Sequence, residues 1–239
     1  MELRLLAIFA HPDDETFRCG GTLAILAQRG ARVQVLTATR GQAGSCGEPR
    51  LCSRDELPAV RECELRCACA ALGIEPPRLL DYQDGHLGEA DPEIIVNQIL
   101  GIVREVRPQV MLTYGPEGVS GHLDHIAIGQ FAAEAFRRAG GVAALYTLAV
   151  PQSLAGMLGM TQVRAVPDTM ITLSVDVSPA WEAKQVAMRC HATQLSSTPM
   201  LSAPETKRRQ FFGGEYFVRM ASRFSGEDFM VEVLKDKLL

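Results

Sequence analysis

Three features of the sequence predict an α/β fold, specifically a Rossmann-like three-layer sandwich with a mostly parallel sheet. Short apolar runs alternate with helix-length segments through the first two thirds of the 239 residues. This alternation is typical of βαβ units, whose right-handed crossovers place helices on both faces of a parallel sheet. A composition of 47% hydrophobic and 22% charged residues is that of an ordinary globular protein. We therefore predict one domain over 1–239, with a core over 1–150 that a C-terminal extension over 151–239 completes.

The strands of the core are predicted from continuous apolar runs, which are typical of parallel strands buried on both faces. The first run ends abruptly at Pro12, which has no N–H to donate to a neighbouring strand. A glycine-rich polar loop over 40–47 follows the second run. The four predicted core strands are 3–10, 31–39, 79–80 and 110–114.

Helices are predicted between these strands, and two of their ends carry clear signals. Gly73 stands where a helix over 55–72 would end in a left-handed residue. Asp91 followed by Pro92 is a favoured start for a helix that runs to residue 106. The other two core helices are predicted from Gly20 to about residue 27 and over 122–138. In the last third we predict a strand over 170–177, a helix over 179–192 opened by Ser178, and a strand signal over 211–220.

Charge and hydropathy exclude several classes of partner. A net charge of −4 argues against nucleic acid as the main partner. No apolar run approaches the length of a membrane span. The first residues lack the basic and apolar regions of a signal peptide, so we expect a cytoplasmic protein. The sequence leaves homo-oligomerisation open.

The seven cysteines are spread along the chain without a CxxC pair. We expect most of them to be buried, reduced side chains that pack as small hydrophobic residues. The alternative is a contact between Cys46 and Cys52, which flank a polar loop and could form a disulfide or a reactive thiol.

The most informative segment lies just past the end of the first strand, where His11, Asp13 and Asp14 stand together. In an open α/β sheet, ligands bind at this carboxyl edge. Histidine and aspartate are good ligands for Zn²⁺, and a spare carboxylate beside a metal can act as a base. Taken alone, the segment could also be a charged surface turn.

A second cluster follows the strand over 110–114 and contains His122, Asp124 and His125. Because this strand also ends at the carboxyl edge, we expect the two clusters to converge. His11, Asp14 and His125 would then bind Zn²⁺ and leave a fourth position open, as in many catalytic zinc sites. That assignment leaves Asp13 free to take a proton from water.

The two remaining residues of the second cluster have predicted roles in the same reaction. His122 would polarise a carbonyl oxygen or protonate a leaving group. Asp124 would fix the orientation of a histidine ring. Two alternatives stay open: the facial triad of a non-haem Fe(II) enzyme, and a non-catalytic metal- or sugar-binding protein on the same fold. We favour hydrolysis with zinc, because a proton-accepting Asp13 beside a ligand suits water activation.

Three motifs, Ala10–Glu15, Gly20–Ala24 and Gly121–His125, together resemble those of the LmbE-like, or PIG-L, family of zinc-dependent de-N-acetylases. The resemblance implies a Rossmann-like fold and removal of acetyl from an N-acetylglucosamine-type sugar or conjugate, with release of acetate and a free amine. It implies the same three metal ligands and the same base, with His122 stabilising the oxyanion and Arg61 contacting substrate. It also suggests glucosamine conjugates on routes to low-molecular-weight thiols. Further matches to the family lie at 39–41, 61–73, 84–87 and 184–194.

The chain departs from the family pattern at Arg18, Gln42 and Leu123, which puts the exact substrate in doubt more than the chemistry. Some matching residues also have a plainer explanation. Arg61 could be a solvated charge paired with Glu64, three residues further along a helix. Asp84 could serve only the backbone of a turn, and His191 could be structural.

Overall fold

The computed structural model of the chain describes residues 2–223 and 229–235. One seven-stranded sheet forms its centre, in the order β3-β2-β1-β4-β5-β7-β6. The strands from β3 to β5 run parallel, while β7 is antiparallel to both β5 and β6. The predicted α/β fold with a mostly parallel sheet is therefore confirmed. The strands are β1 Arg4–Phe9, β2 Arg32–Thr39, β3 Arg78–Tyr82, β4 Val110–Tyr114, β5 Ala144–Ala149, β6 Leu173–Asp176 and β7 Gly214–Ser222.

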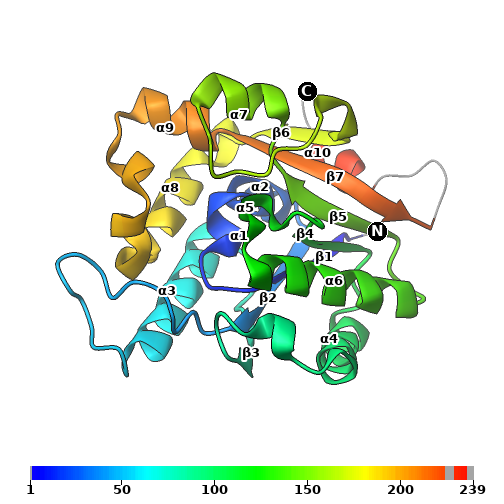
Figure 1. Ribbon diagram of the computed structural model, residues 1–239. Helices are drawn as coiled ribbons and strands as arrows, with labels where there is room; N and C mark the ends of the chain where they lie inside the picture. The colour runs from blue at the N-terminus through cyan, green and yellow to red at the C-terminus, as the bar shows by residue number, and fades with distance from the viewer. Residues whose placement is uncertain (1, 224–228, 236–239) are drawn as a thin grey trace.

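Helices cover both faces of the sheet (Figure 1). On one side α2, α3 and α8 pack together, and on the other α4 packs against α6. No helix of the described ranges is long and apolar enough to cross a membrane. The helices are α1 Asp14–Phe17, α2 Gly20–Gln28, α3 Leu57–Leu72, α4 Pro92–Val106, α5 Gly118–Gly121, α6 Leu123–Arg138, α7 Gln152–Leu158, α8 Trp181–Cys190, α9 Glu205–Phe212 and α10 Phe229–Lys235.

The central position of β1 explains its apolar sequence. It pairs in parallel with β2 on one side and β4 on the other, and its residues from Leu5 to Phe9 are fully buried. A strand between two neighbours and two helix layers has no wet face, so every position favours an apolar side chain. The chain then reaches the carboxyl edge at residue 10, where the polar cluster begins.

The structure confirms the two helix boundaries that the sequence predicts from a specific residue. Gly73 adopts φ 70° and ends α3, and the Asp91 carboxylate accepts hydrogen bonds from the backbone N–H groups of Glu93 and Ile94. Three predicted spans need correction. The strand expected over 170–177 is limited to Leu173–Asp176, because residues 168–170 form a 3₁₀ turn. The helix expected over 179–192 is α8, which a short 3₁₀ turn precedes, and the strand expected from residue 211 begins at Gly214 because α9 extends to Phe212.

Glu215, a member of a buried ion pair, connects the C-terminal third of the chain to the start of α2. Glu215 on β7 accepts hydrogen bonds from the backbone N–H groups of Gly21 and Thr22, at 2.9 and 2.7 Å. Its partner is Lys184 on α8, whose Nζ lies 2.6 Å from a Glu215 carboxylate oxygen. A carboxylate at the first turn of α2 satisfies N–H groups that have no partner within the helix.

Most of the cysteines are buried and free, as expected, but two of them form a disulfide that the sequence did not indicate. Cys67 of α3 and Cys190 of α8 form a disulfide across 123 residues of sequence. The expected contact between Cys46 and Cys52 is present, since both pack with Leu57 in a small apolar cluster, but both are free. Sequence spacing could not reveal the pairing, because the packing of α8 on α3 brings its members together.

Candidate active site

The two polar clusters meet at the topological switch point of the sheet. From β1 the chain continues to β2 and β3 on one side, and from β4 to β5 on the other. Loops that leave β1 and β4 therefore diverge and open a crevice at the carboxyl edge. His11 follows β1 and His125 follows β4, and His11 Nδ1 lies 3.2 Å from His125 Nε2. Residues 114 positions apart are thus brought into contact, as the strand-end argument predicts.

The third predicted ligand lies with them. Asp14 Oδ1 is 3.2 Å from His125 Nε2, and Asp14 Oδ2 is 3.7 Å from His11 Nδ1. Donor atoms that surround a tetrahedral zinc ion at its usual bond lengths are about 3.4 Å apart. The two histidine nitrogens have this spacing, and Asp14 presents a different carboxylate oxygen to each of them. The donor atoms of His11, His122 and His125 also lie within 4.8 Å of one another.

Hydrogen bonds on the far side of each ring turn the facing nitrogens into acceptors. His11 Nε2 lies 3.0 Å from Asp84 Oδ1 and 3.2 Å from Asp124 Oδ2, so it donates its proton to a carboxylate. His125 Nδ1 lies 3.1 Å from the carbonyl oxygen of Gly118 and donates to it. In the neutral rings, two lone pairs and the Asp14 carboxylate then converge without a donor between them. A cation satisfies this arrangement.

The charges around the rings favour a positive species at the same point. Burial lowers the pKa of His11, but its hydrogen bonds to Asp124 and Asp84 and the charge of Asp14 outweigh burial and raise that pKa to about 10. For His125 the opposing effect of Asp14 likewise exceeds that of burial and raises the pKa. Burial alone would raise the pKa of Asp14, but the charge of His125 holds that pKa well below its usual range.

Asp14 is held in place by several donors. Its Oδ2 accepts hydrogen bonds from the backbone N–H groups of Ala10 and His11, at 3.1 and 2.9 Å. Its Oδ1 accepts from the Tyr114 hydroxyl at 2.6 Å. The Tyr114 ring also stacks on His125, with ring centroids 4.0 Å apart and planes 5° from parallel. One side chain at the end of β4 therefore contacts two of the three predicted ligands.

Asp124 contacts the His11 ring, as an orienting residue should. Its two carboxylate oxygens also accept the backbone N–H groups of Gly85 and Leu87, at 2.7 and 3.0 Å. The explanation of Asp84 as only a turn residue is wrong. Its carboxylate does accept the N–H of Ala43, but it also bonds His11, so it belongs to the site. The donor atoms of His11, Asp84 and Asp124 form a second group within 4.8 Å of one another.

Asp13 lies beside this centre in an unusual backbone conformation, with φ 103°. Non-glycine residues rarely adopt a left-handed φ, so surrounding contacts must hold it. Its N–H donates to Glu15 Oε2 at 2.9 Å. Burial raises the pKa of Asp13, the charge of Arg61 opposes that rise, and the net result is about 6.

Arg61 is buried against Asp13, so the alternative of a solvated charge paired with Glu64 is wrong. Its guanidinium lies 3.2 Å from Asp13 Oδ2 and donates to the carbonyl oxygens of Gly41, at 2.7 Å, and Pro12. Glu64 instead accepts both the N–H and the hydroxyl of Thr193.

His122 stands at the exposed side of the centre as the residue preceding α6. Its Nδ1 accepts the backbone N–H of Asp124 at 3.2 Å, so the neutral ring carries its proton on Nε2. Burial and the charges of His11 and His125 lower its pKa, which favours this neutral form. The His122 ring lies 4.9 Å, between centroids, from each of those two rings.

His191 is fully buried and bonds Glu15, not the predicted ligands. Burial lowers its pKa, but the charge and hydrogen bond of Glu15 outweigh burial and raise it. No local pattern in the sequence marks this contact, because the two residues are 176 positions apart.

Comparison with known proteins places the chain in a family. A sequence model of the family described as GlcNAc-PI de-N-acetylase, PIG-L, matches residues 6–136, and the chain belongs to this family. The chain is also 33% identical over 255 residues to a 1D-myo-inositol 2-acetamido-2-deoxy-α-D-glucopyranoside deacetylase of Acidothermus cellulolyticus, with 90% of this chain and 87% of the relative covered. The enzyme of the same name from Rhodococcus jostii is 35% identical over 245 residues, with 83% and 84% covered.

Solved structures share the fold at lower identity. The N,N'-diacetylchitobiose deacetylase from Pyrococcus horikoshii has a TM-score of 0.69 at 21% identity, covering 93% of this chain and 87% of that one. GalB, the 4-carboxy-2-hydroxymuconate hydratase from Pseudomonas putida, has a TM-score of 0.70 at 20% identity, covering 95% and 100%. Because a hydratase matches as well as a deacetylase, likeness at this level shows the fold and not the reaction.

Proposed function

We propose that this protein is a zinc-dependent hydrolase that removes the acetyl group from an N-acetylglucosamine-type sugar conjugate and releases acetate and a free amine. The observation that carries this proposal is the Asp13 carboxylate, which is not one of the three proposed ligands and interacts electrostatically with Asp14. The names of the relatives indicate the substrate class: an N-acetylglucosamine unit joined to myo-inositol. We also propose that residues 1–239 act as one domain, since β6 and β7 complete the sheet.

His11, Asp14 and His125 would hold the zinc ion. When bound, zinc supplies a water of lowered pKa and polarises the carbonyl oxygen of the acetamide. The support for this assignment is the spacing of the donors and the outward hydrogen bonds of both imidazole rings, described above. Asp84 and Asp124 would orient His11, and Tyr114 would orient Asp14.

Asp13 would act as the general base and then as the general acid. Its carboxylate takes a proton from the attacking water as the water oxygen bonds to the acetamide carbon. The same proton passes to the nitrogen when the C–N bond breaks, so that the amine leaves neutral. Arg61 keeps the carboxylate in place from the buried side. We also propose that Arg61 contacts the substrate, as the family resemblance implies.

His122 would stabilise the negative charge that develops on the carbonyl oxygen. Its Nε2 carries the proton in the neutral ring, so it can donate a hydrogen bond. Its exposure places it where a substrate can reach it, whereas the ligands behind it are mostly buried. A donor that acts on charge formed only in the transition state raises kcat more than it lowers KM.

The proposal is tested by acetate release from 1D-myo-inositol 2-acetamido-2-deoxy-α-D-glucopyranoside, with N,N'-diacetylchitobiose as a second substrate. The protein is assayed as purified, after chelation, and after addition of Zn²⁺ or Fe²⁺, with metal content measured each time. His125→Ala should lose bound metal and activity. Full zinc content in His125→Ala, or no acetate from either substrate in the zinc-loaded protein, would refute the proposal. Recovery with Fe²⁺ alone would favour iron.

A further inference from the structure

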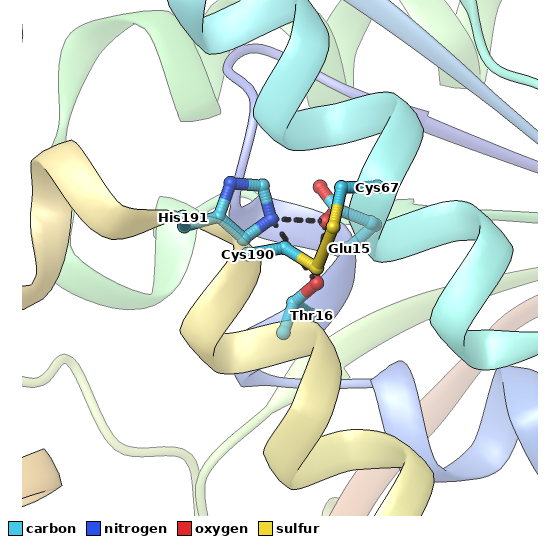
Figure 2. Close-up of a disulfide and its surroundings, with 5 residues drawn as sticks. All are labelled: Glu15, Thr16, Cys67, Cys190 and His191. Atoms are coloured by element: carbon cyan, nitrogen blue, oxygen red, sulfur yellow. Dashed lines mark hydrogen bonds and ion pairs between the residues drawn. A yellow bond between two sulfur atoms is a disulfide. The ribbon is translucent and has the colours of Figure 1, made fainter.

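A buried pair formed by a carboxylate and an imidazole lies directly behind Asp13. Glu15 and His191 are fully buried, and His191 Nε2 lies 2.8 Å from Glu15 Oε1 (Figure 2). The hydroxyl of Thr16 donates to the same oxygen at 2.5 Å. The other oxygen, Oε2, accepts the backbone N–H of Asp13. Both Glu15 oxygens are therefore occupied, one by His191 and Thr16 and the other by Asp13.

This pair bonds a residue whose backbone conformation needs support from its surroundings. The φ of Asp13 lies in the left-handed region, which a non-glycine residue keeps only when its surroundings fix it. The bond from its N–H to Glu15 is one of those constraints, and Arg61 supplies another at the side chain. If Glu15 shifted, the Asp13 amide would lose its acceptor and its carboxylate would point elsewhere.

His191 is in turn held by the disulfide. It follows Cys190 directly, and Cys190 is bonded to Cys67 on α3 (Figure 2). Two residues after His191, Thr193 bonds Glu64 on the same helix. The chain is thus bonded to α3 both before and after His191. Cys67 is exposed and lines a surface groove with Cys190, so a reductant can reach the bridge.

We propose that His191 is a positioning residue for Asp13 and acts through Glu15. The Cys67–Cys190 disulfide holds His191 in place, so turnover depends on the redox state of this bridge. The inference rests on the proposed role of Asp13 as the base. It adds a residue from the last quarter of the chain, outside the two clusters that supply the ligands.

Reduction of the bridge is an ordinary thiol–disulfide exchange with a dithiol. One thiolate of the reductant attacks a bridge sulfur, the S–S bond breaks, and the second reductant thiol releases the mixed disulfide. The dithiol gives up two electrons and two protons and becomes a disulfide, while Cys67 and Cys190 become thiols. Thr193 still bonds Glu64 afterwards, so His191 becomes less constrained without being released. We expect a partial fall in turnover.

The first test compares two substitutions of the positioning residue in the zinc-loaded protein. His191→Ala removes the N–H that Glu15 accepts, whereas His191→Gln keeps an N–H donor. Loss of a residue that orients an active-site group costs about 10–100-fold in activity. We expect a loss of this size in kcat for His191→Ala, little change in KM, and partial recovery in His191→Gln. A merely structural residue would instead lower the melting temperature and leave kcat of the folded protein unchanged, which would overturn the proposal.

The second test uses the disulfide. Acetate release by the oxidised protein should fall after treatment with a dithiol, by less than in His191→Ala. Cys67→Ser should match the reduced protein and should not respond to the dithiol. Cys63→Ser is the matched control: Cys63 is an exposed, free cysteine one turn earlier on α3, and its variant should behave as wild type in both states. Equal turnover of the oxidised protein, the reduced protein and Cys67→Ser would overturn the proposal.

A third measurement separates this inference from the proposed reaction. Hydrogen exchange of the peptide that covers residues 10–17, followed by mass spectrometry, does not require a substrate. Reduction, Cys67→Ser and His191→Ala should each speed exchange at the Asp13 amide. If the amide responds and no acetate is released by the wild type, the proposed reaction is wrong and the positioning contact is supported. If exchange is unchanged in all three, the positioning role is wrong whatever the activity.

Discussion

The hydroxyl of Tyr114 gives the most direct test of how the metal centre is held. Its hydrogen bond to Asp14 Oδ1 is short, at 2.6 Å, and the tyrosine is buried. Tyr114→Phe removes only this hydroxyl and keeps the ring that stacks on His125. The packing around the site should therefore survive, and the change isolates one hydrogen bond to one ligand.

The expected loss follows from what remains around Asp14. Removal of a residue that orients a metal ligand typically costs about 10–100-fold in metal affinity. Asp14 keeps two backbone donors on its other oxygen, from Ala10 and His11. We therefore expect the lower end of that range, a zinc Kd raised about tenfold, which corresponds to about 1.4 kcal/mol. The free energy of unfolding of the chelator-treated protein should also fall by about 1.5–3 kcal/mol, the value of a hydrogen bond to a charged group.

Competition with a chromophoric zinc chelator measures the Kd, and urea unfolding measures the stability. Tyr82→Phe is the control, because its hydroxyl bonds Gln98 and touches no proposed ligand. A zinc Kd in Tyr114→Phe equal to that of Tyr82→Phe would show that Asp14 is not a ligand or that Tyr114 does not orient it.

Three further predictions concern the base, the oxyanion donor and the packing of α2. Asp13→Asn should keep zinc and lose about 10²–10⁴-fold in acetate release, since an amide cannot accept the proton of water; turnover near that of wild type would exclude Asp13 as the base. His122→Asn, which keeps a favoured residue before α6, should lower kcat by about 10²–10³-fold with a smaller change in KM; a pure KM effect in steady-state kinetics would indicate ground-state binding instead. Gly21→Ala should lower the free energy of unfolding by about 1–3 kcal/mol, because the added Cβ would lie 2.4 Å from Val177 Cβ; unchanged urea unfolding would mean that Val177 moves aside.

The residues of the site that could be predicted from the sequence are those that follow the end of a strand. His11 and His125 follow buried apolar runs, and parallel strands put such residues at one edge whatever the loops do. Asp84 could have been found by the same argument, because it follows the short run at 79–80. Aspartate serves turns so often that this position alone does not indicate a site, and the contact with His11 depends on a loop whose path the sequence does not specify.

The features that could not be predicted depend on how elements distant in the sequence pack together, or on a pattern that fits two structures. The burial of Arg61 depends on the loop at Gly41 folding over α3, and a helical pattern alone does not distinguish that from an exposed charge. The sequence does not predict β5, because its short run of small and apolar residues is equally compatible with a helix. The Cys67–Cys190 pair requires the relative position of α3 and α8, which the spacing of cysteines does not encode.

Asp13 shows why the position of a residue can be predicted from the sequence while its conformation cannot. Its place beside the ligands is set by the residues next to it, since it lies between His11 and Asp14 at the end of β1. Its conformation is set by one local and two long-range contacts. Glu15 accepts the amide N–H, Arg61 of α3 pairs with the carboxylate, and His191 bonds Glu15 from the far end of the chain. A donor set can be specified by a short motif because metal ligands need only the right atoms near one point. A base must also point in one direction, and for Asp13 that direction requires a backbone conformation that the residue does not favour by itself. The packing of the C-terminal segment on α3 is therefore part of the catalytic apparatus that we propose, although that segment supplies none of the proposed zinc ligands.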